Sequence, residues 1–272
     1  MSWWPAPAKL NLFLHVLGRR ADGYHELQTV FRLIDRADRV GVAPRDDGRL
    51  TFQGPFGDDN LCLRAARLLK ERSGTPLGAD LALEKALPVG GGLGGGSSDA
   101  ATVLLVLNKL WNTALSRDRL LEIALELGAD VPFFVFGESA LGEGVGERLR
   151  AIRLPAAWYL VLVPQVAVST REIFSAALTG TAKALTIPPF FAGLGKNDLE
   201  AIVTARHREV AAALEWLKAR RPQARMTGTG ACVFAEFADE AAARALQAEL
   251  PRGMEGFVAQ GLDRHPLYDW VS

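Results

Sequence analysis

The stretch Pro88-Val89-Gly90-Gly91-Gly92-Leu93-Gly94-Gly95-Gly96-Ser97-Ser98-Asp99-Ala100 decides how the chain is organised. Six of the seven residues 90–96 are glycine, so an anion can approach the main-chain amides closely. Residues 81–87 predict a strand, and apolar residues at helical spacing over 100–111 predict a helix with Ser97 or Ser98 as its N-cap. A glycine-rich loop that runs into a helix N-terminus presents unpaired N–H groups and a positive dipole end, and therefore predicts a nucleotide phosphate site.

Two other interpretations of the glycine run are weaker. A flexible linker would not be placed between an alternating strand and a capped apolar helix. The spacing of Gly90, Gly92 and Gly95 fits a dinucleotide fingerprint, but so dense a run matches many spacings. That fingerprint also needs an acidic residue about 20 positions on, at the end of a strand, where this chain has the helical segment 116–122. The P-loop pattern, with Lys-Ser/Thr after the last glycine, is absent.

Composition indicates an ordinary globular enzyme. The 272 residues are 49% hydrophobic and 23% charged, and 31 basic residues balance 31 acidic ones, so no net field favours nucleic acid or an anionic membrane. Cys62 and Cys232 lie far apart on apolar segments and are expected to be buried thiols in a reducing compartment. We find no apolar run of membrane-spanning length and no signal-peptide pattern, and expect a cytoplasmic protein with a small-molecule partner.

Polar residues interrupt the first predicted strand. Over residues 8–16, Lys9 and Asn11 share one face with Phe13 and His15, opposite a leucine face. This face is either an edge in water or a polar site on the sheet, and the pattern alone favours the edge. The polar segment 19–27 follows, with turn residues Asp22-Gly23 beside Tyr24 and His25. An aromatic and a histidine on such a turn are binding candidates.

The rest of the first half alternates strands and helices. We expect a strand pair or a bent strand over 30–42, a hairpin turn at 45–48, and a helix over 61–72 capped by Asp59 or Asn60. A further helix over 120–127 leads to Asp130, which we place at the start of an apolar strand over 131–136, with Pro132 holding its neighbour extended. Asp130 is either a capping residue or a base held between helix and strand.

Residues 155–157 are the best domain boundary, giving domains 1–155 and 156–272. Strands are expected over 158–163, 232–237 and 256–261, and helices over 170–178, 197–221 and 239–250, with a proline-rich connection at 187–189. This order predicts a ferredoxin-like α+β domain. A second glycine turn, Met226-Thr227-Gly228-Thr229-Gly230-Ala231, predicts a ligand held where the domains meet.

Five segments in this order resemble the GHMP kinase superfamily: Ala8 to Leu12, Asp22 to His25, Pro88 to Ala101, Gly128 to Pro132 and Thr227 to Gly230. The likeness runs from about residue 6 to 261. It implies an α+β fold with an N-terminal ribosomal protein S5 domain 2-like domain and a ferredoxin-like C-terminal domain. Lys9-x-Asn11 and Tyr24-His25 are similar to members that act on a cytidine diphosphate-linked sugar alcohol in non-mevalonate isoprenoid synthesis. ATP and Mg²⁺ are the implied cofactors, and we expect a monomer or weak homodimer.

The resemblance also implies roles for individual residues in phosphoryl transfer to the 2-hydroxyl of the methylerythritol group. Asp130 would accept the hydroxyl proton and Lys9 would stabilise the developing alkoxide. Mg²⁺ would lie near Ser97 or Ser98, with Ser98 as its ligand, and Asn60 and Lys85 would reach the nucleotide. The ATP phosphates would lie on the loop formed by Pro88, Val89, Gly90, Gly91, Gly92, Leu93, Gly94, Gly95 and Gly96.

The cytidine would be held differently. Tyr24 and Phe174 would stack on the two faces of the pyrimidine, and His25 would hydrogen-bond its edge. Asn11 and Thr170 would contact the sugar or phosphate. By spacing alone Phe174 is a core residue of a helix. Competing functions are a superfamily kinase for homoserine, mevalonate or a sugar, a non-catalytic nucleotide-binding or regulatory module, and a dinucleotide oxidoreductase.

Overall fold

A long antiparallel ribbon, β1 (Ser2–Arg19) and β2 (His25–Arg45), forms the spine of the molecule. The structure is a computed structural model that describes residues 1–177 and 195–271. The ribbon reverses at the predicted turn, where Gly23 N–H donates to the carbonyl of Arg20 at 3.1 Å. Segment 30–42 is therefore one continuous part of β2, with irregular register against β1, and not two paired strands.

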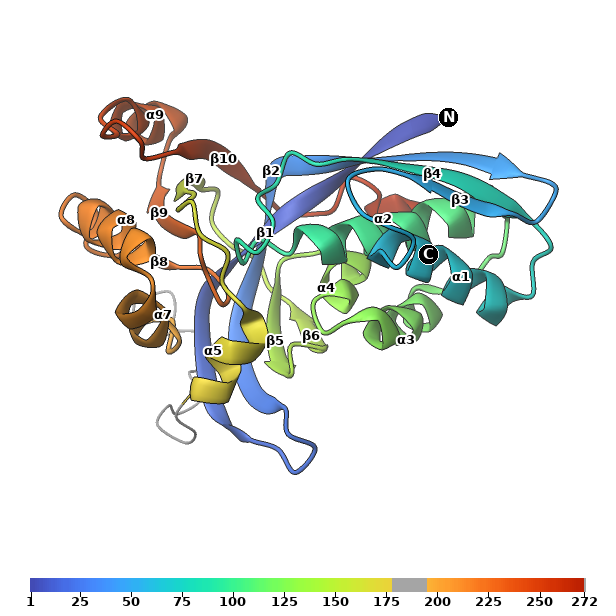
Figure 1. Ribbon diagram of the computed structural model, residues 1–272, viewed down its shortest axis with the longest axis horizontal. Coiled ribbons are helices and arrows are strands. Elements are labelled where there is room, and N and C mark those ends of the chain that lie inside the picture. The colour runs from blue at the N-terminus through green and yellow to red at the C-terminus, as the bar shows by residue number, and fades with distance from the viewer. Residues whose placement is uncertain (178–194, 272) are drawn as a thin grey trace.

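The first half of the chain builds a sheet around this ribbon. β2 pairs with β4 (Gly78–Glu84) and β5 (Ala140–Gly144), while β3 (Leu50–Gln53) pairs with β4 and β6 (Arg148–Ala151) with β5. Helices α1 (Leu61–Ser73), α2 (Gly95–Leu110), α3 (Arg117–Leu127) and α4 (Val131–Phe136) gather on one side of the sheet (Figure 1). Their apolar faces and the sheet enclose the largest core cluster, in which α2 is buried over most of its length.

The predicted helix boundaries are confirmed at α1 and wrong at α2. Asn60 caps α1 by accepting from Leu63 N–H at 3.0 Å, and Gly74 closes the helix in the left-handed region. At α2 the cap is Gly94 rather than a serine, so the last glycines of the run form the first helical turn. A glycine in the left-handed region can start a helix that the serine pattern places three or four residues later.

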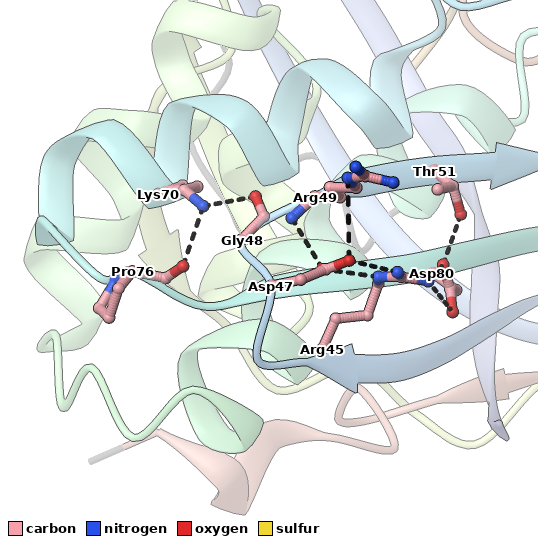
Figure 2. A network of polar contacts seen from close by, with 8 residues as sticks. All are labelled: Arg45, Asp47, Gly48, Arg49, Thr51, Lys70, Pro76 and Asp80. Carbon is pink, nitrogen blue, oxygen red and sulfur yellow. Dashed lines mark hydrogen bonds and ion pairs between the residues drawn. The ribbon is translucent and has the colours of Figure 1, made fainter.

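Two further expectations are wrong. Residues 131–136 form the helix α4, not a strand. A short apolar run buried on all sides has no decisive period, and proline in the first turn favours a helix start. The turn at 45–48 does not close a hairpin, because β3 pairs in parallel with β4 and not with β2. There Arg45, Asp47 and Asp80 form a surface network of ion pairs (Figure 2).

The second half has the expected ferredoxin-like order. Strands β7 (Trp158–Leu162), β8 (Arg225–Met226), β9 (Val233–Phe237) and β10 (Gly256–Leu262) lie in the antiparallel order β10-β7-β9-β8. The helices are α5 (Thr170–Ala176), α7 (Glu200–Arg206), α8 (Arg208–Lys218) and α9 (Glu240–Ala248). The helix expected over 197–221 is interrupted at His207, whose backbone is extended. The proline-rich connection at 187–189 lies outside the described residues.

The two halves are joined through the sheet and through the end of the chain. β10 pairs with β2 at Gly261 and Leu262, which links the two sheets. The short helix η2 (Tyr268–Trp270) then returns to the first half, where Arg117 donates to the carbonyls of Tyr268 and Val271. The division at residue 155 stays a prediction, and it does not account for this returning segment. Among the described residues no helix has the length and apolar character needed to cross a membrane.

Candidate active site

Lys9 and Asp130, far apart in the sequence, meet in space as expected. Lys9 lies on β1 and is 2% exposed, while Asp130 precedes α4 and its side chain is 38% exposed. Lys9 Nζ is 3.4 Å from Asp130 Oδ2 and donates to Asn11 Oδ1 at 2.5 Å. The polar face of β1 is therefore the lining of a site and not the water-facing edge that the pattern alone favoured.

Asn11 is fixed from both halves of the molecule. Its Nδ2 donates to Thr29 Oγ1 at 2.8 Å, and its main-chain N–H donates to Thr227 Oγ1 at 2.9 Å. Thr29 in turn donates to the carbonyl of Phe13 at 2.5 Å. Because each of these groups is buried and hydrogen-bonded, the amide that accepts from Lys9 has little freedom to rotate.

The glycine run needs its glycines for close packing as well as for conformation. Gly92 has a φ of +75°, and a Cβ there would come within 2.3 Å of the carbonyl oxygen of Thr227. The second glycine turn docks on the first, since Ala231 and Cys232 N–H groups donate to the carbonyls of Gly90 and Gly91. The two glycine turns therefore pack against each other where the halves meet, and the ligand expected between them stays a prediction.

A cavity of about 450 Å³ lies between these turns and the ribbon. It receives residues from both halves, and most of the residues expected from the sequence line it. Those are Lys9, Asn11, Lys85, Pro88, Val89, Gly90, Gly91, Gly92, Leu93, Gly94, Gly95, Gly96, Ser97, Asp130, Thr170 and Phe174.

Ser98 and Asn60 do not line this cavity. The Ser98 hydroxyl is fully buried and donates to the carbonyl of Pro7 at 2.7 Å, whereas Ser97 lines the cavity. Asn60 lines a neighbouring hollow of about 390 Å³, and that hollow shares Phe56, Leu61 and Gly96 with the cavity. Asn60 therefore stays close to the glycine run, while the hydroxyl of Ser98 is occupied elsewhere.

The residues expected to hold cytidine lie at the tip of the ribbon and on α5. His25 stacks on Phe174 with ring centroids 5.3 Å apart, and Thr170 Oγ1 is 3.0 Å from Thr229 Oγ1. Tyr24 is 62% exposed at the turn. Partial burial and the charge of Arg19 hold the pKa of His25 below its usual value, which favours the neutral imidazole at pH 7.

Several residues of this site were not predicted from the sequence. Thr29 and Phe31 line the cavity, and Asp38 lies behind the glycine run. Asp38 stands in the charged stretch Asp35-Arg36-Ala37-Asp38-Arg39, so no local pattern marks it. In the described part of the chain no group of three or more His, Cys, Asp or Glu residues could hold a metal ion. A cation here would need phosphate oxygens as ligands.

Comparison with known proteins agrees with this geometry. The model of the GHMP kinases N terminal domain matches residues 60–138, and that of GHMP kinases C terminal matches residues 185–256. The chain is 58% identical to the 4-diphosphocytidyl-2-C-methyl-D-erythritol kinase of Nitrosospira multiformis, over 98% of this chain and 94% of the relative. It is 59% identical to the protein of the same name from Thiobacillus denitrificans, over 98% of each.

Solved structures show the same fold. A crystal structure of 4-(cytidine 5'-diphospho)-2C-methyl-D-erythritol kinase superposes with a TM-score of 0.86 at 36% identity, covering 96% of this chain and 99% of the other. The homoserine kinase of Cytophaga hutchinsonii superposes with a TM-score of 0.72 at 18% identity, covering 96% and 94%. At that identity the second likeness concerns the fold alone.

Proposed function

The chain belongs to the GHMP kinases, among the 4-diphosphocytidyl-2-C-methyl-D-erythritol kinases, and from that membership we propose that it uses ATP to phosphorylate the 2-hydroxyl of 4-diphosphocytidyl-2-C-methyl-D-erythritol. This reaction belongs to the non-mevalonate route to isoprenoid precursors. The observation that carries the proposal is the 3.4 Å approach of Lys9 Nζ to Asp130 Oδ2 inside a cavity lined by the whole glycine run.

Asp130 accepts the proton of the acceptor hydroxyl as phosphoryl transfer proceeds. Its side chain is partly exposed to the cavity, makes no capping hydrogen bond to α4 and so keeps a carboxylate oxygen for the substrate. Phosphoryl transfer passes through a loose transition state in which bond formation lags, so a weak base suffices if it is well placed. Lys9 lies beside the carboxylate and stabilises the negative charge that develops on the acceptor oxygen.

The glycine run binds the triphosphate. Its lack of side chains lets phosphate oxygens reach main-chain N–H groups at the start of α2, where the helix dipole favours an anion. Mg²⁺ binds in proteins through few protein ligands and several phosphate oxygens, which fits the absence of a carboxylate cluster among the described residues. Ser97 lines the cavity and is better placed than Ser98 to face such an ion.

The cytidine binds at the tip of the ribbon against α5. The Phe174 ring supplies a stacking face, and Tyr24, exposed at the neighbouring turn, closes on the other face of the pyrimidine. A neutral His25 offers one donor and one acceptor to the base edge. Asn11 and Thr170 both line the cavity and contact the sugar or phosphate. We further propose a cytoplasmic monomer or weak homodimer.

An ADP-release assay with three acceptors tests this function. Purified protein, ATP and Mg²⁺ are combined with the cytidyl substrate, with mevalonate or with homoserine. We expect rapid ADP release with the cytidyl substrate alone, and a product whose ³¹P spectrum shows a new phosphomonoester. Equal turnover with mevalonate or homoserine would assign the chain to another specificity. No acceptor-dependent ADP release with any of the three would remove the kinase assignment.

A further inference from the structure

Three charged residues meet directly behind the glycine run. Asp38 lies on β2, Lys85 follows the last residue of β4, and Asp99 lies in the first turns of α2. Lys85 Nζ donates to Asp38 Oδ2 and, at 3.0 Å, to Asp99 Oδ2. Asp38 is 0% exposed and Asp99 2% exposed, while Lys85 reaches the cavity. The cluster therefore connects the buried sheet with the wall of the nucleotide site.

Asp38 also holds the main chain at the start of the glycine run. Its Oδ1 accepts from the N–H groups of Ala86 and Leu87 at 2.7 and 2.8 Å. These two residues immediately precede Pro88, which has no N–H of its own to anchor the chain. One carboxylate thus serves two purposes: Oδ1 fixes the chain that enters the run, and Oδ2 holds Lys85.

The same cluster lies close to the far end of the run. A Cβ built on Gly95, the first residue of α2, would lie 3.0 Å from Lys85 Nζ and 3.2 Å from Asp38 Oδ2. The two ends of the glycine run are therefore spanned by one buried carboxylate and its lysine. A loop with so little side-chain packing of its own depends on such contacts for a fixed shape.

We propose that Asp38 is a positioning residue for the nucleotide: it fixes the main chain entering the glycine run and holds Lys85 at the end of the run, so that the loop is preformed for the triphosphate. The proposal rests on the proposed function, because it takes the run as the ATP phosphate site. Preforming the loop lowers the cost of ordering it on binding, so loss of Asp38 weakens nucleotide binding in particular.

Asp38→Asn tests the proposal. The amide keeps one oxygen for the main-chain N–H groups and removes the charge that holds Lys85. We expect the KM for ATP to rise about ten-fold or more, since hydrogen bonds to charged groups are worth that much, and the KM for the cytidyl substrate to change less than two-fold. Asp80→Asn is the matched control, because Asp80 is an ion-paired aspartate on β4, remote from the cavity. It should leave both KM values unchanged.

Two results would overturn the proposal. One is an unchanged KM for ATP in Asp38→Asn. The other is a parallel loss of affinity for both substrates, which is the signature of general damage to the fold. If Asp38→Asn does not fold, Lys85→Met provides the test, because it removes one of the two contacts and spares the main-chain bonds. This variant should raise the KM for ATP and leave the KM for the cytidyl substrate unchanged. An unchanged KM for ATP refutes the proposal.

A binding measurement separates this proposal from the proposed function. Calorimetric titration with a non-hydrolysable ATP analogue needs no acceptor and no turnover. If the wild-type protein binds the analogue but phosphorylates none of the three acceptors, the proposed function is wrong. The role of Asp38 is then tested by the affinity of the Asp38→Asn variant for the analogue. We expect that affinity to be about ten-fold weaker than wild type, and equal affinities would refute the claim.

Discussion

Each end of β4 lies in a cluster of two aspartates and one basic residue, and the cluster is exposed at one end and buried at the other. At its start, Asp80 and Asp47 pair with Arg45 on the surface (Figure 2), and hydrogen bonds from Thr51 and Arg45 lower the pKa of Asp80. Just past its end, Lys85 pairs with the buried Asp38 and Asp99. There burial raises the pKa of Asp99 to about 7, even though Lys85 opposes the rise.

The difference shows what burial does to a cluster of charges. At the surface, a basic partner stabilises the ionised carboxylate with little loss of hydration, and solvent screens the attraction between the two charges. In the interior, desolvation outweighs one shared lysine, and each group becomes necessary to its neighbours. The cluster beside the cavity is therefore expected to be sensitive to substitution, and the cluster in Figure 2 to be tolerant.

The largest effect is expected at the cavity carboxylate that faces substrate. Asp130→Asn is nearly isosteric and removes only the basic oxygen, so kcat should fall about 100-fold or more, the usual contribution of a general base, with the KM for ATP near wild type. Steady-state kinetics measure both constants, with Asp80→Asn as the control. Turnover near the wild-type rate would show that Asp130 is not the base.

The two aromatic rings proposed to hold the cytidine test the contribution of uncharged stacking contacts; Phe174 lines the cavity, and Tyr24 is exposed at the turn outside it. Tyr24→Ala and Phe174→Ala should each raise the KM for the cytidyl substrate about ten-fold, in the range of one lost base–aromatic stacking contact. The KM for ATP should not change, because the proposal places both rings against the cytidine and not against the triphosphate. Initial rates with each substrate varied in turn provide the measurement. Equal effects on both KM values would place these rings outside the cytidine site.

The pH dependence of stability probes the buried cluster. The pKa of Asp99 in the folded state is about 7 against its ordinary value of 3.8, so the folded state binds its proton more tightly than the unfolded state. The resulting stabilisation is complete below about pH 4 and is lost as pH rises through about 7. Asp99→Asn cannot ionise, so its Tm should exceed that of wild type by several degrees at pH 8 and by much less at pH 5. If thermal melts give the same Tm difference between the variant and wild type at pH 5 and pH 8, the pKa of Asp99 is not raised in the folded state.

The smallest effect is expected at the surface cluster. Asp80→Asn removes an ion pair that solvent already screens, so the Tm should change by less than about 3 °C, which is the change that a small free-energy difference produces in a domain of this size. High salt should shrink the difference further. A calorimetric scan at low and high salt tests this, and a large loss of stability would remove the contrast between the two clusters.

The sequence was informative where a local pattern has one physical meaning. The glycine run, the Asn60 cap and the turn at Asp22-Gly23 were predictable, because loop chemistry and capping depend on nearby residues. Residues 131–136 were assigned wrongly, since a run buried on every side carries no period. The partner strand of β3 depends on a crossover through α1, which no local pattern reports.

The residues of the site also divide into those that a local pattern predicts and those that it does not. The approach of Lys9 to Asp130 followed from resemblance and not from spacing, because contacts between distant residues are set by the whole fold. The serine pattern could not tell which hydroxyl faces the cavity, since the early start of α2 rotates Ser98 toward Pro7. Asp38 was not predicted because its partners Lys85 and Ala86 lie far along the chain, just past the end of β4.

A crystal structure with a non-hydrolysable ATP analogue and the cytidyl substrate tests the central claim most directly. We expect the triphosphate on the amides of residues 90–96, and the 2-hydroxyl of the acceptor within about 2.6–3.2 Å of an Asp130 carboxylate oxygen, the range for a general base. Lys9 should lie beside the same hydroxyl. An acceptor hydroxyl directed away from Asp130, or a triphosphate bound outside the glycine run, would contradict the mechanism.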